Sequence, residues 1–374
     1  MTSSHNQIKR RRIKGAATLI VSTTLLVVST LIIIFAANYG MMQDKATGNT
    51  LRFNQAYQAA EAGLEFGINY LKHNSATILA NPVGGFVPAY SDANITNSAL
   101  PDGSRYTIVY SNPVASNYTL IRITSTGTSS DGSSSHTISQ LVQASSALVN
   151  FGTTALLSKG SVNLSGNADI DNFSHNSSIT AGSGVTMSGN ADTTTSTSHS
   201  YPGHYESDIS QNNTTVANMS LSAFIATYFG VGSAGNLQSM VQNYYSNTAN
   251  TNYSSTLNGR SGTTIMINQA AGTTASITGN TVIGTSTNPV LLIVNGQLSI
   301  SGNVRVYGFI FVMGTTGLTS TTGNMEINGA IVSANNLTMS GNSSVNFNTS
   351  ILNNLRNNAS LNYYAKIPGS WKDF

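Results

Sequence analysis

Four carboxylates beyond residue 160 could carry out chemistry if the fold brings them together. Asp169, Asp171 and Asp192 lie close in the sequence, and Glu326 stands apart. Carboxylates gathered on one face of a β-structure can act as the acid and base of a polysaccharide-cleaving enzyme, or bind calcium. Asp169 and Asp171 would point the same way from one strand. Three acids are few for such a site, so exposed solubilising residues are the favoured interpretation.

A second group of polar residues could bind a metal. His199, His204, Glu206 and Asp208 lie in one short stretch, but their spacing fits no standard metal signature, and Pro202-Gly203 indicates a surface turn. The chain has no G-x-S-x-G, no phosphate-binding glycine loop and no H-E-x-x-H. The sequence therefore predicts no catalytic residue, no metal site and no cofactor.

The composition indicates a β-rich protein. Of the 374 residues only 8% are charged, against about a quarter in ordinary globular proteins, while 40% are apolar. Low charge with abundant Ser, Thr, Asn and Gly favours strands held by backbone ladders. There is no cysteine, which excludes disulfides, thiolate metal sites and cysteine nucleophiles.

Positive charge is concentrated at the N-terminus. Five of the sixteen basic residues lie between Lys9 and Lys14, and the rest of the chain has eleven basic against thirteen acidic residues. Without a basic stripe the chain is not expected to bind nucleic acid.

An uncharged segment of twenty-two residues, 16–37, follows this basic stretch. As a helix it would be about 33 Å long, enough to cross a hydrocarbon core of about 30 Å. The preceding basic residues place the N-terminus in the cytoplasm and the large remainder outside. The run is too long for an ordinary secretory signal, and no cleavage site follows it. A plain signal anchor would also fit the hydropathy.

The helical pattern continues beyond the apolar segment. Apolar residues recur every three or four positions, and polar residues, Glu61 among them, occupy the other side. This apolar stripe consists of Phe53, Tyr57, Ala60, Leu64, Ile68 and Leu71. No proline interrupts residues 16–72, so one rod of about 85 Å is predicted, although glycines such as Gly63 and Gly67 make it easier to bend.

These N-terminal residues resemble those of the type IV pilins. The text Arg12-Ile-Lys-Gly15-Ala16-Ala-Thr-Leu is similar to a prepilin leader, which implies cleavage between Gly15 and Ala16 by a prepilin peptidase. Gln55-Ala-Tyr-Gln-Ala-Ala-Glu61-Ala-Gly63 resembles the N-terminal region of PilX-like minor pilins. The resemblance implies other minor and major pilins and an inner-membrane assembly platform as partners.

One position departs from the pattern of the major pilins. They carry a glutamate as the fifth mature residue, where this chain has Ile20. The resemblance implies that this acid neutralises the N-terminal amine of a neighbour in the membrane, where an unpaired charge is costly. The departure favours a rare, tip-proximal subunit.

Residues 74–148 show the alternation of strands. The runs around Tyr106, Leu120 and Leu141 are separated by turn-rich text, which predicts an antiparallel meander. In the pilin arrangement this sheet would cover the apolar stripe of the long helix.

Residues 149–350 contain a repeat whose common element is a Gly-Asn pair after a small polar residue. Within unbroken stretches the glycines are 23, 23, 21 and 18 residues apart. Gly and Asn tolerate positive φ and suit the corner of a coil, and stacked asparagines can form ladders. We therefore expect a right-handed parallel β-helix of about six coils. Its predicted corners are Gly166-Asn167, Gly189-Asn190, Gly279-Asn280, Gly302-Asn303, Gly323-Asn324 and Gly341-Asn342.

Two further segments complete the predicted organisation. An insert at 196–262 should contain helices over 221–230 and 237–245 that cap or flank the coils. The tail, 351–374, holds the only tryptophan, Trp371, expected to anchor against the last coil or to contact a neighbour.

The predicted fold is thus α+β. A leader (1–15) precedes a long pilin helix (16–73) and a short antiparallel sheet (74–148), and the solenoid and tail follow. The function expected is a minor pilin of the inner membrane, displayed after processing on a pilus or the cell surface, that takes part in assembly initiation. The assembly helix would act through Ile20, Phe53, Tyr57, Glu61 and Leu64. Alternatives are an adhesin that binds a surface glycan or host ligand, and third a polysaccharide-degrading β-helix enzyme.

Overall fold

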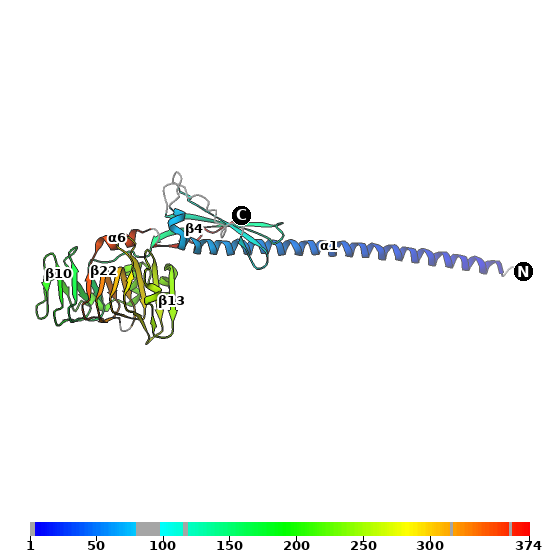
Figure 1. The fold of residues 1–374 in the computed structure, drawn as a ribbon. Helices are drawn as coiled ribbons and strands as arrows, with labels where there is room; N and C mark the ends of the chain where they lie inside the picture. The colour runs from blue at the N-terminus through cyan, green and yellow to red at the C-terminus, as the bar shows by residue number, and fades with distance from the viewer. Residues whose placement is uncertain (1–3, 80–97, 115–118, 315–316, 359–360) are drawn as a thin grey trace.

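The structure, a computed structural model, describes residues 4–79, 98–114, 119–314, 317–358 and 361–374. It consists of one very long helix, an antiparallel sheet packed on the end of that helix, and two parallel sheets beyond it (Figure 1). This is an α+β arrangement. The N-terminus lies at the far end of the helix, and the C-terminus lies back on the antiparallel sheet.

Helix α1, Ser4–Leu79, is a single rod of 76 residues. The one residue with non-helical dihedral angles is Asn74, close to its C-terminal end. The side chains from Thr18 to Asn54 are exposed almost throughout, and the helix meets the rest of the chain from Arg52 onward. The predicted continuity across the apolar and amphipathic segments is therefore what the structure has.

The antiparallel sheet has the order β1-β2-β3-β4-β25, with β26 also paired to β4. Together with the C-terminal part of α1 it forms what we call the head domain. The predicted meander corresponds to β2, β3 and β4. Its strands are β1 (Ser98–Ala99), β2 (Arg105–Ser111), β3 (Leu120–Thr128), β4 (Ser135–Ser146), β25 (Asn362–Lys366) and β26 (Lys372–Asp373).

The apolar stripe of α1 packs on this sheet. Ala60, Leu64, Ile68 and Leu71 are buried, whereas Phe53, the first residue of the stripe, is 49% exposed and touches the sheet at His136, with 5.1 Å between the ring centroids. Burial of the four stripe residues against Ile108, Ile121, Ile123 and other strand residues provides the main stabilisation of the head domain. The hydroxyl of Tyr110 also donates a hydrogen bond of 2.7 Å to the carbonyl of Gly67.

Glycines allow the helix and sheet to approach closely. A Cβ at Gly127 would lie 2.1 Å from the carbonyl oxygen of Ala56, and one at Gly63 would lie 2.8 Å from Cγ of Tyr106. We expected Gly63 and Gly67 to soften the rod. The structure instead places both at the helix–sheet interface, where no larger side chain fits unless a neighbour moves.

The rest of the chain forms the parallel-sheet domain, which has two sheets around one core. In the described residues the larger sheet has 13 strands and the smaller has seven, and every pair is parallel except β10–β11. The larger sheet contains β5 (Leu156–Ser158), β7 (Asp169–Asn172), β8 (Ile179–Ala181), β10 (Asp192–Thr195), β11 (His199–Ser200), β12 (Ile209–Ser210), β13 (Asn243–Asn247), β15 (Thr264–Gln269), β17 (Thr281–Ile283), β18 (Val290–Asn295), β20 (Val304–Val312), β22 (Met325–Ser333) and β24 (Ser344–Asn346). The smaller contains β6 (Val162–Leu164), β9 (Val185–Met187), β14 (Thr251–Asn252), β16 (Thr274–Ile277), β19 (Gln297–Ser301), β21 (Leu318–Thr322) and β23 (Leu337–Met339).

The spatial order of the repeats differs from their order in the chain. The smaller sheet runs β14-β16-β19-β21-β23-β6-β9, so the last repeat of the chain lies beside the first. Leu337 pairs with Val162, and in the larger sheet Ile331 pairs with Leu156. The end with β13 lies nearest α1, and β10 lies at the free end (Figure 1).

The crossing from the free end back to β13 is the true insert. It holds α2 (Thr214–Asn218), α3 (Leu221–Phe229) and α4 (Ala234–Met240). Helix α3 flanks the larger sheet, since the ring of Phe229 meets that of Phe311 at 4.9 Å between centroids. The predicted bounds 196–262 are too wide, because β11, β12, β13 and β14 within them are strands of the two sheets. These strands are short and polar, so the sequence shows no alternation that would have predicted them. The second predicted helix ends at Met240, where β13 soon follows, and α5 (Ser254–Leu257) takes the place of a strand.

The tail does not end on the last coil, and the expected place of Trp371 there is wrong. Helix α6 (Thr349–Asn357) packs on β20 and β22. The chain then returns to the head domain, where Asn362 pairs with Ser146 and Lys372 with Ser139. The edge of β4 that β3 does not cover offers a row of free backbone donors and acceptors, so the C-terminal tail pairs with β4 rather than with the last repeat. The right-handed β-helix itself stays a prediction.

Candidate functional site

Helix α1 carries most of the exposed large apolar side chains of the described residues. Ile20 is 65% exposed within a segment that is apolar on every side. In the described part of the chain, α1 is the one helix long and apolar enough to cross a membrane, with a mean hydropathy of 2.6 over its most apolar stretch. The predicted cleavage residues Gly15 and Ala16 lie in this helix, outside the residues whose side chains are described.

The other predicted assembly residues lie where α1 enters the head domain. Tyr57 is partly buried and Leu64 is buried, while Glu61 is exposed. Tyr57 donates a hydrogen bond to Glu61, and this bond is the main cause of the raised pKa of the Tyr57 hydroxyl.

Strand β25 and the residues that follow it form a groove with this part of helix α1. Glu61, Glu65, Lys366 and Trp371 line a hollow of about 520 Å³, and Glu65 pairs with Lys366 across it. Trp371 is 45% exposed. No local sequence pattern indicates that Trp371 and Glu61 line the same hollow, because they are 310 residues apart.

The six predicted corner asparagines form one line, which we call the asparagine ladder. Five of the six side-chain amides donate a hydrogen bond to the side-chain oxygen of an adjacent ladder asparagine, over 2.8–3.1 Å, and Asn280 accepts the bond at one end of the line. Because the last repeat lies beside the first, Asn167 donates to Asn342. The ladder therefore runs Asn280, Asn303, Asn324, Asn342, Asn167, Asn190.

A tight stack requires a positive φ at each corner and no side chain between neighbouring corners, and the corner glycines provide both. All six have positive φ, between 70° and 109°. A Cβ on Gly302 would lie 2.7 Å from the backbone nitrogen of Gly279 in the neighbouring repeat, and Gly166, Gly189 and Gly323 show similar close approaches. Gly279, at the end of the line, has open space around it.

A second line of residues lies two positions after each ladder asparagine. Strand register places these residues side by side on the outward face, and we call them the outer row. In spatial order they are Val282, Arg305, Glu326, Ser344, Asp169 and Asp192. The stacking thus brings Glu326 into line with Asp169, with only Ser344 between them. Aligning the repeats on Gly-Asn would have revealed the row but not its order.

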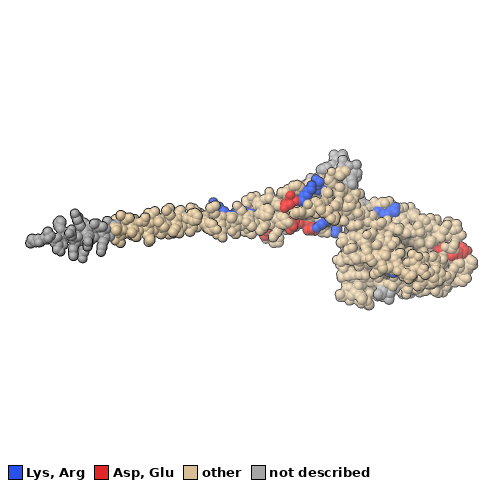
Figure 2. Space-filling view, turned by 180° about the vertical axis from the view of Figure 1, so that it is seen from behind, with Lys and Arg blue, Asp and Glu red and all other residues tan. Residues whose placement is uncertain are grey.

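The acidic end of this row is electrostatically strained. Burial, followed by the charges of Asp171 and Asp192, raises the pKa of Asp169 to about 6. Burial and Asp192 also raise the pKa of Asp171. Figure 2 shows acidic side chains gathered at the free end of the parallel-sheet domain. In the described residues no group of three or more acidic or histidine side chains is arranged to hold a metal ion.

The geometry also disfavours catalysis at these acids. Asp169 and Asp192 are direct register partners on β7 and β10, and Asp192 contributes to the raised pKa of Asp169. Glycosidases keep their two carboxyl groups about 5–10 Å apart so that the scissile bond or a water fits between them. Carboxylates at directly paired positions of neighbouring strands, whose backbones lie about 4.8 Å apart, leave less space than that.

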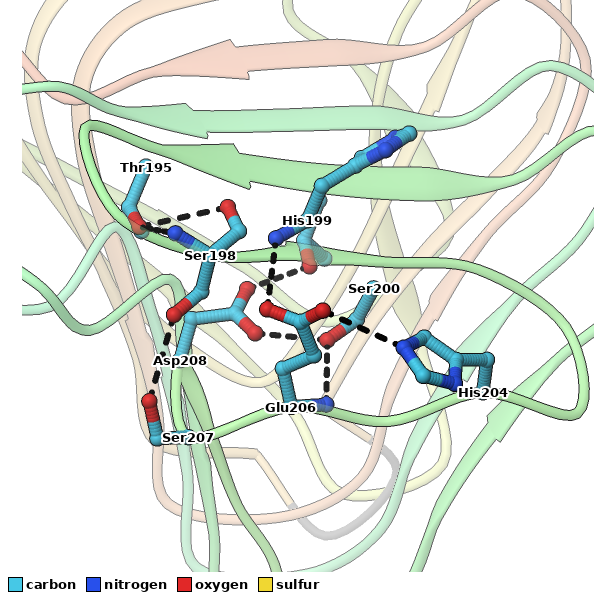
Figure 3. A network of polar contacts seen from close by, with 9 residues as sticks. Thr195, Ser198, His199, Ser200, His204, Glu206, Ser207 and Asp208 are labelled. Carbon is cyan, nitrogen blue, oxygen red and sulfur yellow. Dashed lines mark hydrogen bonds and ion pairs between the residues drawn. The ribbon is translucent and has the colours of Figure 1, made fainter.

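The histidine-containing stretch lies at the free end of the stack, where β11 is the last strand of the larger sheet, and its polar side chains form a network (Figure 3). The buried carboxylate of Asp208 accepts hydrogen bonds of 2.5 Å from Thr193 and Ser200. Nε2 of His204 lies 3.1 Å from Oε1 of Glu206. The other carboxylate oxygen of Glu206 accepts a hydrogen bond from the backbone N–H of His199. Polar groups of this segment pair with the last strand of the smaller sheet: the Tyr205 hydroxyl accepts from the backbone of Met187. The stretch is an end cap that protects a sheet edge.

Comparison with known proteins gives little further guidance. No protein-family model and no curated protein matches the chain. Among solved structures, the competence-associated pilin ComZ from Thermus thermophilus aligns over 86% of this chain and 97% of its own, at 12% identity and a TM-score of 0.24. A TM-score this low carries no argument about a shared fold or role.

Proposed function

We propose that this chain is a minor subunit of a type IV pilus or pseudopilus, structural rather than catalytic. In this proposal α1 anchors the precursor in the inner membrane with its N-terminus in the cytoplasm. After cleavage, the same helix packs among the helices of other pilins. The partners would be other minor and major pilins, a prepilin peptidase and the assembly platform.

The observation that carries the proposal is the bare part of α1 between the apolar span and the head domain. The side chains of residues 38–51 are exposed almost throughout, and Tyr39, Met42 and Leu51 expose 59–71% of their surface; Arg52 and Phe53 are the first to reach the head domain, at Asp131 and His136. A membrane anchor alone needs about 20 residues. Exposed apolar side chains on a helix that continues beyond the membrane favour contact with neighbouring helices.

The leader is tested by replacing its last residue. Gly15→Ala should leave an uncut precursor in the membrane, because the resemblance assigns cleavage to the bond after Gly15. Gly48→Ala is the matched control, since a Cβ at Gly48 meets nothing closer than 3.9 Å. Intact mass measurement of both proteins from cells gives the answer. Normal shortening of the Gly15 variant would contradict the proposal.

We further propose that the subunit lies near the tip and helps to initiate assembly. Ile20 supports this, because a subunit without an acid at that position suits a repeating lattice poorly. Ser146 and Asn362 are direct partners on β4 and β25. Residues 149–358 can therefore be replaced by a short turn while both strands of the head domain are kept. Loss of pili in that deletion would support initiation by the parallel-sheet domain, and normal piliation would restrict that domain to display.

An adhesin that binds a surface glycan is the second candidate. It is compatible with the first, and the polar groove beside the asparagine ladder, described below, favours it. A polysaccharide-degrading enzyme is third, and the paired Asp169 and Asp192 make it the least supported.

A further inference from the structure

A polar groove runs along the asparagine ladder on the outer face of the parallel-sheet domain. It has a volume of about 520 Å³ and crosses β17, β20, β22 and β24. Its sides are formed by Asn280, Asn303, Asn324 and Asn342 on one side and by Arg305 and Glu326 on the other. We call it the ladder groove. It is at right angles to the strands, so it follows the axis of the stack.

The ladder supplies this groove with regularly spaced hydrogen-bonding groups. A side-chain amide has two N–H donors and two acceptor lone pairs. The ladder bonds use one donor and one lone pair of Asn303 and of Asn324. Both side chains are exposed, so a second donor and a second lone pair of each face solvent. Neighbouring strands place these groups about 4.8 Å apart.

The charge of the groove limits what it can bind. The Arg305 side chain pairs with Glu326 at 2.7 Å, so the two charges compensate. Further along the same row lie Asp169 and Asp192, which would repel an anionic chain. Nucleic acids and acidic polysaccharides are therefore disfavoured.

The lining also disfavours a protein partner. Protein interfaces depend on a few large anchors, chiefly Trp, Tyr and Arg, that fill desolvated pockets. The groove has no aromatic residue in its described lining, and its one arginine already has a partner. Strands β20, β22 and β24 beneath it are paired on both sides, and the other edge of β17 is covered by Asn258 and Gly259, so these backbones do not offer an edge to an additional strand.

We propose that the ladder groove binds a linear polysaccharide without anionic groups, laid along the axis of the stack. Its hydroxyl groups would pair with the free donors and acceptors of the ladder, and exposed Val282 offers a small apolar surface for a sugar ring. The inference rests on the second proposed function, surface binding, and not on membership of a pilus.

The test measures binding of soluble oligosaccharides to the full-length chain in detergent. Cello-oligosaccharides and chito-oligosaccharides represent neutral chains, and alginate oligosaccharides represent anionic ones. Ser344→Tyr places a ring in the groove, and Asn163→Tyr places the same ring on an exposed position of β6 in the other sheet. We expect a neutral chain to bind, the Ser344 variant to lose at least about tenfold in affinity, equal to one or two good hydrogen bonds, and the Asn163 variant to bind normally.

A second variant guards against a folding defect. The double substitution Arg305→Gln with Glu326→Gln keeps polar side chains on the wall but removes both charges, and should leave thermal unfolding unchanged while altering affinity. Equal binding by the parent, the Ser344 variant and this double variant would overturn the groove but leave the adhesin candidate standing. Failure of the parent to bind any neutral chain, or preference for alginate, would overturn the proposed ligand class. Neither result would affect the pilin proposal, whose test is cleavage at Gly15.

Discussion

The head domain and the parallel-sheet domain are both mainly β-structure, but they are stabilised in different ways. In the head domain one helix meets one sheet, and the fit depends on single close approaches such as that of Gly127 to Ala56. In the parallel-sheet domain each repeat is held by two similar neighbours, and the same bond recurs along the asparagine ladder. A defect in the head domain should therefore affect the whole interface, whereas a defect in the stack should depend on its position.

The largest effect is expected for Gly127→Ala. Its Cβ would lie 2.1 Å from the carbonyl oxygen of Ala56 and 2.3 Å from the backbone nitrogen of Ala60, so the sheet must move away from α1. We expect a loss of roughly 3 kcal/mol in the stability of the head domain, the upper range for overpacking. Hydrogen exchange should then be faster in β3 and in α1 around Leu64, and unchanged in β18 and β20.

Gly132→Ala provides the control for this substitution. Gly132 lies in the β3–β4 turn with φ of 72° and open space around it, so only backbone strain of about 1 kcal/mol is expected. Equal destabilisation by the two variants would show that close approach is not what holds the head domain together.

A smaller effect is expected in the ladder, and it should depend on position. Asn342 bonds to both Asn324 and Asn167 and so joins the two halves of the stack, whereas Asn190 at the free end bonds only to Asn167 in the ladder. Asn342→Ala should cost about 1 kcal/mol more than Asn190→Ala, the net value of one hydrogen bond. Denaturant unfolding monitored in the parallel-sheet domain measures the difference. Identical midpoints would mean that the ladder bonds of Asn342 at the junction contribute no more to stability than the ladder bond of Asn190 at the free end.

The smallest effect is expected from charge. The pKa of Asp169 is raised to about 6 in the folded chain, above its ordinary value of 3.8. Between these pH values the folded state binds more protons than the unfolded state, so stability falls as pH rises through this window. Asp169→Asn should therefore raise the unfolding temperature at pH 7 and leave it unchanged at pH 3, with a gain below about 1 kcal/mol because solvent screens the partly exposed group.

Asp131 in the head domain gives the opposite sign and so sharpens the contrast. Hydrogen bonds from Ser133 and Ser129, together with Arg52, lower the pKa of Asp131. Its contribution is present above the ordinary pKa of an aspartate and is lost on acidification. Asp131→Asn should lower the unfolding temperature at pH 7. A fall for both variants would show that the Asp169 cluster is not strained.

Much of this architecture could be predicted from local patterns. The long helix follows from an apolar run and a stripe without proline, and β2, β3 and β4 follow from alternation. The Gly-Asn pairs mark the corners because few other residues accept positive φ without strain. These features depend on residues near one another in the chain, where periodicity and conformational preference act directly.

The order of the stack could not be predicted in the same way. Successive repeats present nearly equivalent edges. The amino-acid sequence around Asn342 therefore does not indicate that its neighbour in the stack will be Asn167. That pairing decides which acids share a row, and it places Glu326 near Asp169. The tail was missed for a related reason: β26 has two residues, too few to show a period, and β25 has only five.

The pairing of Ser146 with Asn362 has a mechanical consequence. The chain leaves the head domain and returns to it through two segments that lie side by side at this point. A pull on the free end of the stack is therefore divided between two covalent connections before it reaches α1, and the hydrogen bonds between them are loaded in shear. The two connections also resist torsion between the domains, so the head domain and the parallel-sheet domain should rotate as one rigid unit under tension.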